Sequence, residues 1–215
     1  MEIFKNSRMS ASHPVSLPPL AASLAGRGPR LVIVPGWKGS GPGHWQSLWA
    51  ERLPGAVRVE QADWLFPSRT AWVGALSDLI RSEPGPVVLA AHSLGCITVA
   101  HLPPDVAARV QGALLVAPAD PERRGALTDF APVPFQKLPY RSILVASSHD
   151  PFCPVRLAGA YARAWGSEFV RVPDAGHLNV ESGHGDWPLG LALLQSLSSS
   201  SFLAPEPQVH LSEIS

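Results

Sequence analysis

A chain of 215 residues with 46% apolar residues is long enough for one domain with a full hydrophobic core. Its formal net charge is zero and only 16% of its residues are charged, which argues against a nucleic acid or an anionic membrane as partner. No apolar run is long enough to span a membrane. The two cysteines, Cys96 and Cys153, form no metal-binding or redox spacing, so the sequence favours a cytoplasmic protein.

The chain divides into a central domain and two low-complexity ends. Residues 1–29 mix Ser, Pro, Gly and Arg without hydrophobic periodicity, and are expected to form a flexible leader that starts at Met1 or Met9. The domain is expected at residues 30–197, followed by a flexible tail at 198–215.

Strand and helix patterns alternate through the domain. Short apolar or alternating runs predict strands at residues 31–34, 57–60, 87–91, 112–118, 142–147 and 169–173. Apolar stripes predict helices at residues 44–53, 70–80, 157–165 and 186–197, and a further helix after Gly95 that Pro103 and Pro104 end. Thr70 is the expected N-cap of its helix, and residues 119–140 are expected to form an insertion over the sheet edge.

This alternation predicts a three-layer α/β fold. About six mostly parallel strands should form one sheet with helices on both faces and a minimal cap. Functional residues of such sheets lie in the loops after the carboxyl ends of the strands.

The stretch at residues 86–96 has the pattern of a nucleophile elbow. A buried-strand run leads directly into Ser93, and a helical segment follows. Ala91 and Gly95 are the small residues that such a turn requires on either side, although alanine replaces the usual first glycine. Ser93 is therefore the candidate nucleophile, with a plain strand-to-helix turn as the alternative.

A serine nucleophile needs a base, and the base needs an acid that orients it. Asp150 follows the fifth predicted strand and His177 follows the sixth, which is the chain order Ser, Asp, His of elbow-containing folds. We therefore predict a Ser93–His177–Asp150 triad. Asp120, after the fourth strand, is the alternative acid, whereas His92, His149 and His184 are expected to have packing or surface roles.

Backbone N–H groups that stabilise an oxyanion are expected from Leu94, after the nucleophile, and from Trp37, in the loop after the first strand. Aromatic residues near strand ends are candidates for substrate binding or for the core: His44, Trp64, Phe66 and Phe152. Lys38 either attracts an acidic substrate or is a solvated loop lysine. No histidine and carboxylate spacing predicts a metal site, and no cofactor is expected.

These motifs resemble the small serine hydrolases of the retinoblastoma-binding-protein-9/YdeN type, within the α/β-hydrolase superfamily. The resemblance covers roughly residues 30–197 and is carried by these segments: 34–37, 43–45, 63–64, 91–95, 149–151 and 176–179. It implies a nearly capless domain with a Ser-Asp-His triad and carboxylesterase-like activity. The retinoblastoma-protein partner is not expected, because Thr98 replaces the glutamate of the relevant Leu-x-Cys-x-Glu element.

The sequence leaves two functional hypotheses. The first is a serine hydrolase, favoured as a monomer, that cleaves small esters or amides with short acyl groups. The second is a binding or regulatory module that keeps the fold with vestigial catalysis.

Overall fold

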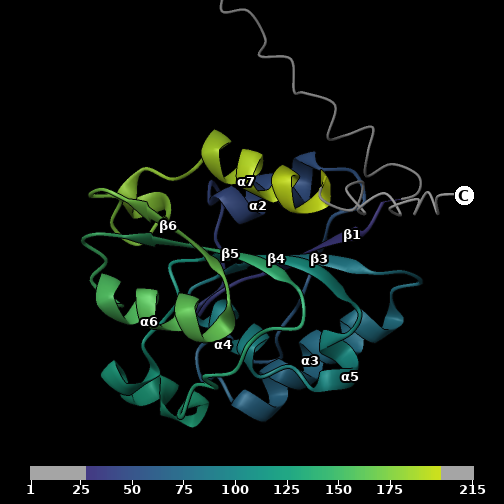
Figure 1. Cartoon of the computed structure of the whole chain (residues 1–215), viewed down its shortest axis with the longest axis horizontal. Helices are drawn as coiled ribbons and strands as arrows, with labels where there is room; N and C mark the ends of the chain where they lie inside the picture. Colours follow the sequence, from purple (N-terminus) through teal and green to yellow (C-terminus); the bar gives the residue numbers. More distant parts are fainter. Residues whose placement is uncertain (1–27, 200–215) are drawn as a thin grey trace, which may run out of the picture.

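The computed structural model describes residues 28–199, which form one α/β domain (Figure 1). The expected leader and tail therefore lie almost wholly outside the described residues. Within the described part, no helix is both long and apolar enough to cross a membrane.

A single sheet of six strands runs through the middle of the domain in the order β2-β1-β3-β4-β5-β6. All neighbouring strands are parallel, as predicted. The strands are β1 (Arg30–Val34), β2 (Val57–Arg58), β3 (Val87–His92), β4 (Val110–Val116), β5 (Arg141–Ser147) and β6 (Glu168–Val172). The central strand β3 is buried along its whole length, which explains its unbroken apolar sequence.

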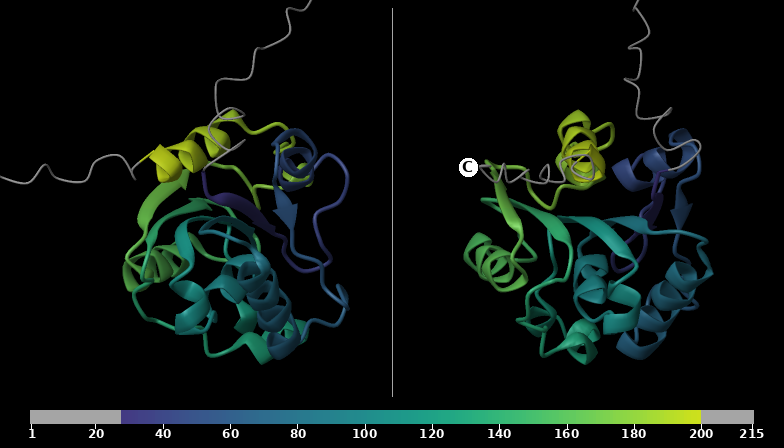
Figure 2. Two further views of the ribbon diagram at one scale, coloured as in Figure 1. Left: turned by 90° about the vertical axis from the view of Figure 1, so that its right-hand side faces the viewer. Right: turned by 45° about the vertical axis from the view of Figure 1, so that its right-hand side comes forward.

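Helices cover both faces of the sheet, so the three-layer prediction is confirmed (Figures 1 and 2). One face carries α2 (Trp45–Arg52) and α7 (Pro188–Ser199); the other carries α3 (Arg69–Ser82), α4 (Leu94–Ala100), α5 (Pro104–Ala107) and α6 (Val155–Trp165). Successive side chains of β1 pack into the hydrophobic core on opposite faces of the sheet, because side chains alternate along a strand. Val32 and Val34 pack on the α3 and α4 side, and Leu31 and Ile33 on the α2 and α7 side.

The structure corrects several expected boundaries. Ser68, not Thr70, occupies the N-cap position of α3, and α7 continues to Ser199, beyond the expected end at residue 197. Pro104 starts the short helix α5, because proline is tolerated in the first turn of a helix.

The insertion at 119–140 contains two 3-10 helices, η1 (Pro121–Arg123) and η2 (Gly125–Phe130). It packs against the α3 and α4 layer through Phe130, whose ring meets Trp72 edge-on and whose carbonyl bonds to His101. A third 3-10 helix, η3 (Val180–Ser182), follows β6.

Candidate active site

The turn between β3 and α4 presents Ser93 at the carboxyl edge of the sheet. Ser93 has a φ of 54° and a ψ of −119°, a strained conformation for a residue with a side chain. Three backbone hydrogen bonds hold it: Ser93 N–H donates to Val116 O at 3.0 Å, and Ser93 O accepts from Ala119 N–H at 3.2 Å and from Cys96 N–H at 3.0 Å. A strand, one strained serine and an immediate helix are the geometry of a nucleophile elbow.

Two glycines let β1 and the elbow come close together. A Cβ on Gly95 would lie 2.3 Å from Val34 O, and a Cβ on Gly36 would lie 2.7 Å from Ser93 Cβ. Side chains at these positions would therefore force the backbone or Ser93 to move. The close approach brings the loop after β1 against the first turn of α4.

This packing brings the loop that carries Trp37 against Leu94, the other residue predicted for the oxyanion hole. Gly36, which precedes Trp37, approaches Leu94 N so closely that an added Cβ would lie 3.3 Å from it. Leu94 is the first residue of α4, so its N–H has no acceptor within the helix. The stabilising role of these two N–H groups stays a prediction.

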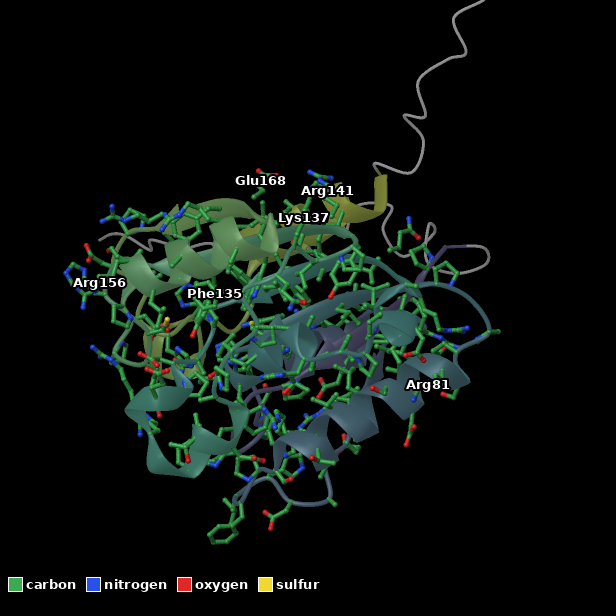
Figure 3. The ribbon with its side chains drawn as sticks, turned by 60° about the horizontal axis from the view of Figure 1, so that its bottom comes forward. Arg81, Phe135, Lys137, Arg141, Arg156 and Glu168 are labelled. Atoms are coloured by element: carbon green, nitrogen blue, oxygen red, sulfur yellow. The ribbon has the colours of Figure 1, made fainter. Side chains whose placement is uncertain are left out.

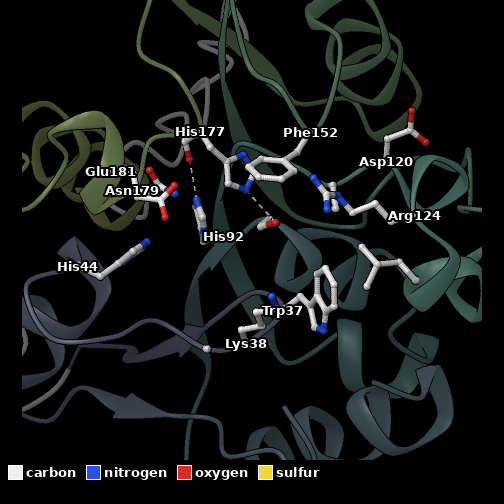
Figure 4. A pocket seen from close by; sticks show the side chains of 14 residues that line it. Trp37, Lys38, His44, His92, Asp120, Arg124, Phe152, His177, Asn179 and Glu181 are labelled. Atoms are coloured by element: carbon white, nitrogen blue, oxygen red, sulfur yellow. Dashed lines mark hydrogen bonds between the residues drawn. The ribbon is translucent and has the colours of Figure 1, made fainter. Parts of the chain in front are cut away.

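His177 and Asp150 complete an unbroken line of hydrogen bonds from Ser93. The Ser93 hydroxyl and His177 Nε2 lie 3.0 Å apart, and a dashed line at His177 marks this bond in Figure 4. His177 Nδ1 lies 3.0 and 2.9 Å from the two Asp150 oxygens. The side chains of His177 and Asp150 are only 9% and 2% exposed. Asp150 also accepts a hydrogen bond from Phe152 N–H at 2.8 Å, which fixes its carboxylate in the loop after β5.

The loop that carries His177 has a strained backbone, and side chains from two other elements hold it by hydrogen bonds. Its residues with positive φ are Asp174, Gly176 and Leu178. His92 Nε2–H donates to the His177 carbonyl at 2.9 Å, and Trp45 Nε1–H donates to the Leu178 carbonyl at 3.0 Å. Strained backbone persists where its surroundings over-determine it, and here β3 and α2 provide the restraints. His92, expected only to pack, thus ties the residue before the serine to the backbone of His177.

Three histidine rings follow one another along this side of the site. The ring centroids of His44 and His92 lie 4.9 Å apart, and those of His92 and His177 lie 4.8 Å apart. His44 caps α2 by accepting from Gln46 N–H at 3.1 Å through Nδ1. Burial, followed by the positive potential of neighbouring histidines, lowers the pKa of His44 to about 4, and burial lowers the pKa of His92 well below 6.5.

We expect these buried histidines to make the fold sensitive to acid. Because the folded-state pKa of His44 lies below its unfolded value of 6.5, its contribution to stability is complete above pH 6.5 and is lost as pH falls toward about 4. The loss amounts to about 3 kcal/mol. His44→Asn retains a helix-capping oxygen but does not titrate, so its Tm should fall less steeply than the wild-type Tm over this range. Circular dichroism melts at a series of pH values measure this; parallel curves for the two proteins would contradict it.

A pocket of about 340 Å³ opens above the serine. In Figure 4, Phe152, Arg124 and Trp37 lie on one side of His177, and His44, Asn179 and Glu181 lie on the other. Leu127 also lines the pocket. The Phe152 ring lies 4.4 Å from the His177 ring, centroid to centroid. Of the four residues predicted to bind substrate, His44 and Phe152 therefore line the pocket.

Trp64 and Phe66 do not line the pocket, contrary to the prediction. Trp64 packs edge-on against Trp72, and the Arg58 guanidinium lies over its ring. Trp64 is therefore a partly buried residue at the margin of the hydrophobic core, outside the pocket lining. Phe66 is 79% exposed on a loop that Asp63 turns outward by accepting the N–H groups of Leu65 and Phe66. Sequence position near a strand end did not reveal this turn.

The remaining acid and histidine candidates do not contact Ser93 or His177 through their side chains. Asp120 lines the pocket, but its carboxylate caps η1 and pairs with Arg123 at 3.3 Å instead of contacting His177. His149 is exposed and bonds to Asp174. His184 contacts Ser182 and Trp187 outside the pocket. Residues 28–199 hold no group of three or more His, Cys, Asp or Glu side chains that suits a metal ion.

Comparison with known proteins agrees with this geometry. A family model described as serine hydrolase matches residues 31–196. The chain belongs to the serine hydrolase family. A search of curated protein sequences found no match.

Solved structures support the YdeN side of the resemblance. A YdeN-like hydrolase from Pectobacterium atrosepticum is 32% identical to this hydrolase, with a TM-score of 0.72 over 80% of this chain and 93% of that one. The ydeN product of Bacillus subtilis is 20% identical, with a TM-score of 0.66 over 79% and 98%. A thermophilic esterase from Thermogutta terrifontis is 17% identical, with a TM-score of 0.60 over 81% and 92%. The latter two show a shared fold.

Sequence reasoning missed several residues of the pocket of this serine hydrolase. Arg124 and Leu127 come from the insertion, which has no clear period in the sequence. Asn179 and Glu181 follow His177, and Asn179 forms a capping box with Ser182 at η3. The Asn-x-x-Ser spacing was a readable signal for that cap, whereas nothing local marked Arg124.

Proposed function

We propose that this serine hydrolase cleaves small carboxylic esters or amides through an acyl-Ser93 intermediate. The observation that carries the proposal is the continuous hydrogen-bonded series of Ser93, His177 and Asp150, with the serine in a strained elbow.

In the first step His177 Nε2 takes the proton of the Ser93 hydroxyl while Oγ attacks the carbonyl carbon. The developing oxyanion is stabilised by the N–H groups of Leu94 and Trp37. His177 then gives the proton to the leaving alcohol or amine, which leaves an acyl-serine. Water, deprotonated by the same imidazole, cleaves that ester and regenerates Ser93. Asp150 holds the imidazole in its required tautomer and stabilises the imidazolium.

The pocket volume supports small substrates. A cavity of about 340 Å³ lies at the lower end of the range for small-molecule sites, roughly 300–1,000 Å³. Short acyl groups fit such a cavity, whereas cleavage of long-chain esters alone would contradict this part of the proposal.

A fluorophosphonate probe tests the proposal directly, because it reacts only with an activated serine. We expect the wild-type protein to be labelled and Ser93→Ala and His177→Ala to be unlabelled, with circular dichroism showing that all three are folded. Short p-nitrophenyl esters measured in parallel should be hydrolysed only by the wild type. Folded wild-type protein that neither reacts with the probe nor hydrolyses esters would instead favour the binding-module hypothesis.

A further inference from the structure

Two cationic side chains from separate loops line the same pocket. Lys38 lies in the loop after β1, and Arg124 is the single residue between η1 and η2. Each rests on an aromatic ring of the pocket. Lys38 Nζ lies 4.7 Å from the Trp37 ring centroid, and the Arg124 guanidinium carbon lies 4.4 Å from the Phe152 ring centroid.

Neither cation forms an ion pair within residues 28–199. Of the two acids just before Arg124, Asp120 is held by Arg123 and by the cap of η1, and Glu122 is exposed and forms no ion pair with Arg124. Glu181 lies with His44 and Asn179 on the opposite side of His177 (Figure 4). The Arg124 side of the pocket therefore has positive charge that the protein does not neutralise there.

The stacking places this charge close to the reacting groups. Arg124 lies on Phe152, and Phe152 lies 4.4 Å from the ring of His177. A guanidinium that stacks on a ring keeps its N–H groups directed outward in its own plane, where they match the two oxygens of a carboxylate. Lys38, which is exposed and lines the same pocket from the loop after β1, provides a second donor for an anionic substrate group.

We propose that the substrates of this pocket are esters or amides that carry a carboxylate, which Arg124 and Lys38 bind. The inference rests on the proposed hydrolase function and adds the substrate class. The carboxylate belongs to the acyl part or to the alcohol part of the substrate, and the chemistry of recognition is the same in both.

Two matched substrate pairs separate charge from size. Monomethyl glutarate and methyl pentanoate differ by a carboxylate in place of a methyl group in the acyl part. The acetyl ester of 3-hydroxypropionate and propyl acetate differ in the same way in the alcohol part. Product release followed by NMR gives kcat/KM for each ester, and the ratio within a pair reports on the carboxylate.

The ratio is compared in wild type, Arg124→Gln, Lys38→Gln and Lys137→Gln. Lys137 is the control, because its replacement changes the net charge equally at an exposed site remote from the pocket. Figure 3 shows it near Arg141 and Glu168, which begin β5 and β6, at the edge of the sheet opposite the active site. Its contact with the Gly166 region agrees with this placement.

We expect at least one wild-type ratio to favour the charged ester, and Arg124→Gln to lower that ratio about tenfold, as for a charge-assisted hydrogen bond near the surface. Lys38→Gln should lower it less, Lys137→Gln should leave it unchanged, and added salt should reduce the preference. Equal ratios in wild type and Arg124→Gln would overturn the inference while leaving the hydrolase function intact. Fluorophosphonate labelling without turnover of either charged ester would also overturn it. Failure of both labelling and all ester turnover would instead contradict the proposed function.

Discussion

Replacing Asp150 with asparagine is expected to lower kcat by about 10⁴-fold without unfolding the protein. In the wild type, His177 Nδ1–H donates to a carboxylate that is 2% exposed. In the proposed mechanism this carboxylate balances the positive charge that the imidazole gains when it takes the proton of Ser93. An asparagine amide does not balance that charge, and it permits the tautomer in which Nε2 carries the proton and cannot act as base. The measurement is kcat with p-nitrophenyl acetate, accompanied by circular dichroism of the folded state.

Asp120→Asn is the matched control, because Asp120 is the other acid that the chain order permits. Its carboxylate pairs with Arg123 and caps η1, and asparagine also caps helices well. We expect kcat of this variant to fall by less than about tenfold, because Asp120 lies at the edge of the pocket and its ion pair with Arg123 is near the surface. A larger loss in Asp120→Asn than in Asp150→Asn would show that the acid has been assigned to the wrong residue.

Gly95→Ala is expected to destabilise the fold by about 3 kcal/mol or more, because overpacking against backbone cannot be relieved by a side-chain rotation. The added Cβ would lie 2.3 Å from Val34 O and 2.8 Å from Pro35 O, both main-chain atoms at the end of β1. Relief requires the elbow to move away from β1. For a domain of this size the Tm should fall by roughly 6–12 °C.

Gly74→Ala provides the control for this prediction. Gly74 lies inside α3, and an added Cβ would meet no atom within 4 Å. Alanine there should raise stability by about 0.5–1 kcal/mol, because it reduces the freedom of the unfolded chain without a clash. The comparison uses thermal melts of both variants. An unchanged Tm for Gly95→Ala would mean that the close approach of β1 and the elbow is not required.

Local patterns in the sequence were enough to predict the fold class. Buried strands are short apolar runs and amphipathic helices have a period of 3.6, so the alternation of both predicted a parallel sheet and the edge where functional loops gather. The structure and the family match confirm that fold and the serine hydrolase family. The Ser93, Asp150 and His177 triad was predicted by the same reasoning, since each residue lies at or soon after the end of a strand. The structure brings these three within hydrogen-bond distance, and their catalytic role stays a proposal.

The walls of the pocket were decided by tertiary structure. Trp64 and Phe66 looked equivalent to Phe152 in the sequence, yet only Phe152 packs on His177. Arg124 comes from a segment without periodicity, and it reaches the site because the insertion anchors on α3 and α4 through Phe130. The sequence by itself determined the elements and the loops that carry chemistry, because both depend on neighbours along the chain. Which side chains meet in the pocket depends on contacts between distant segments, and those exist only once the layers have packed.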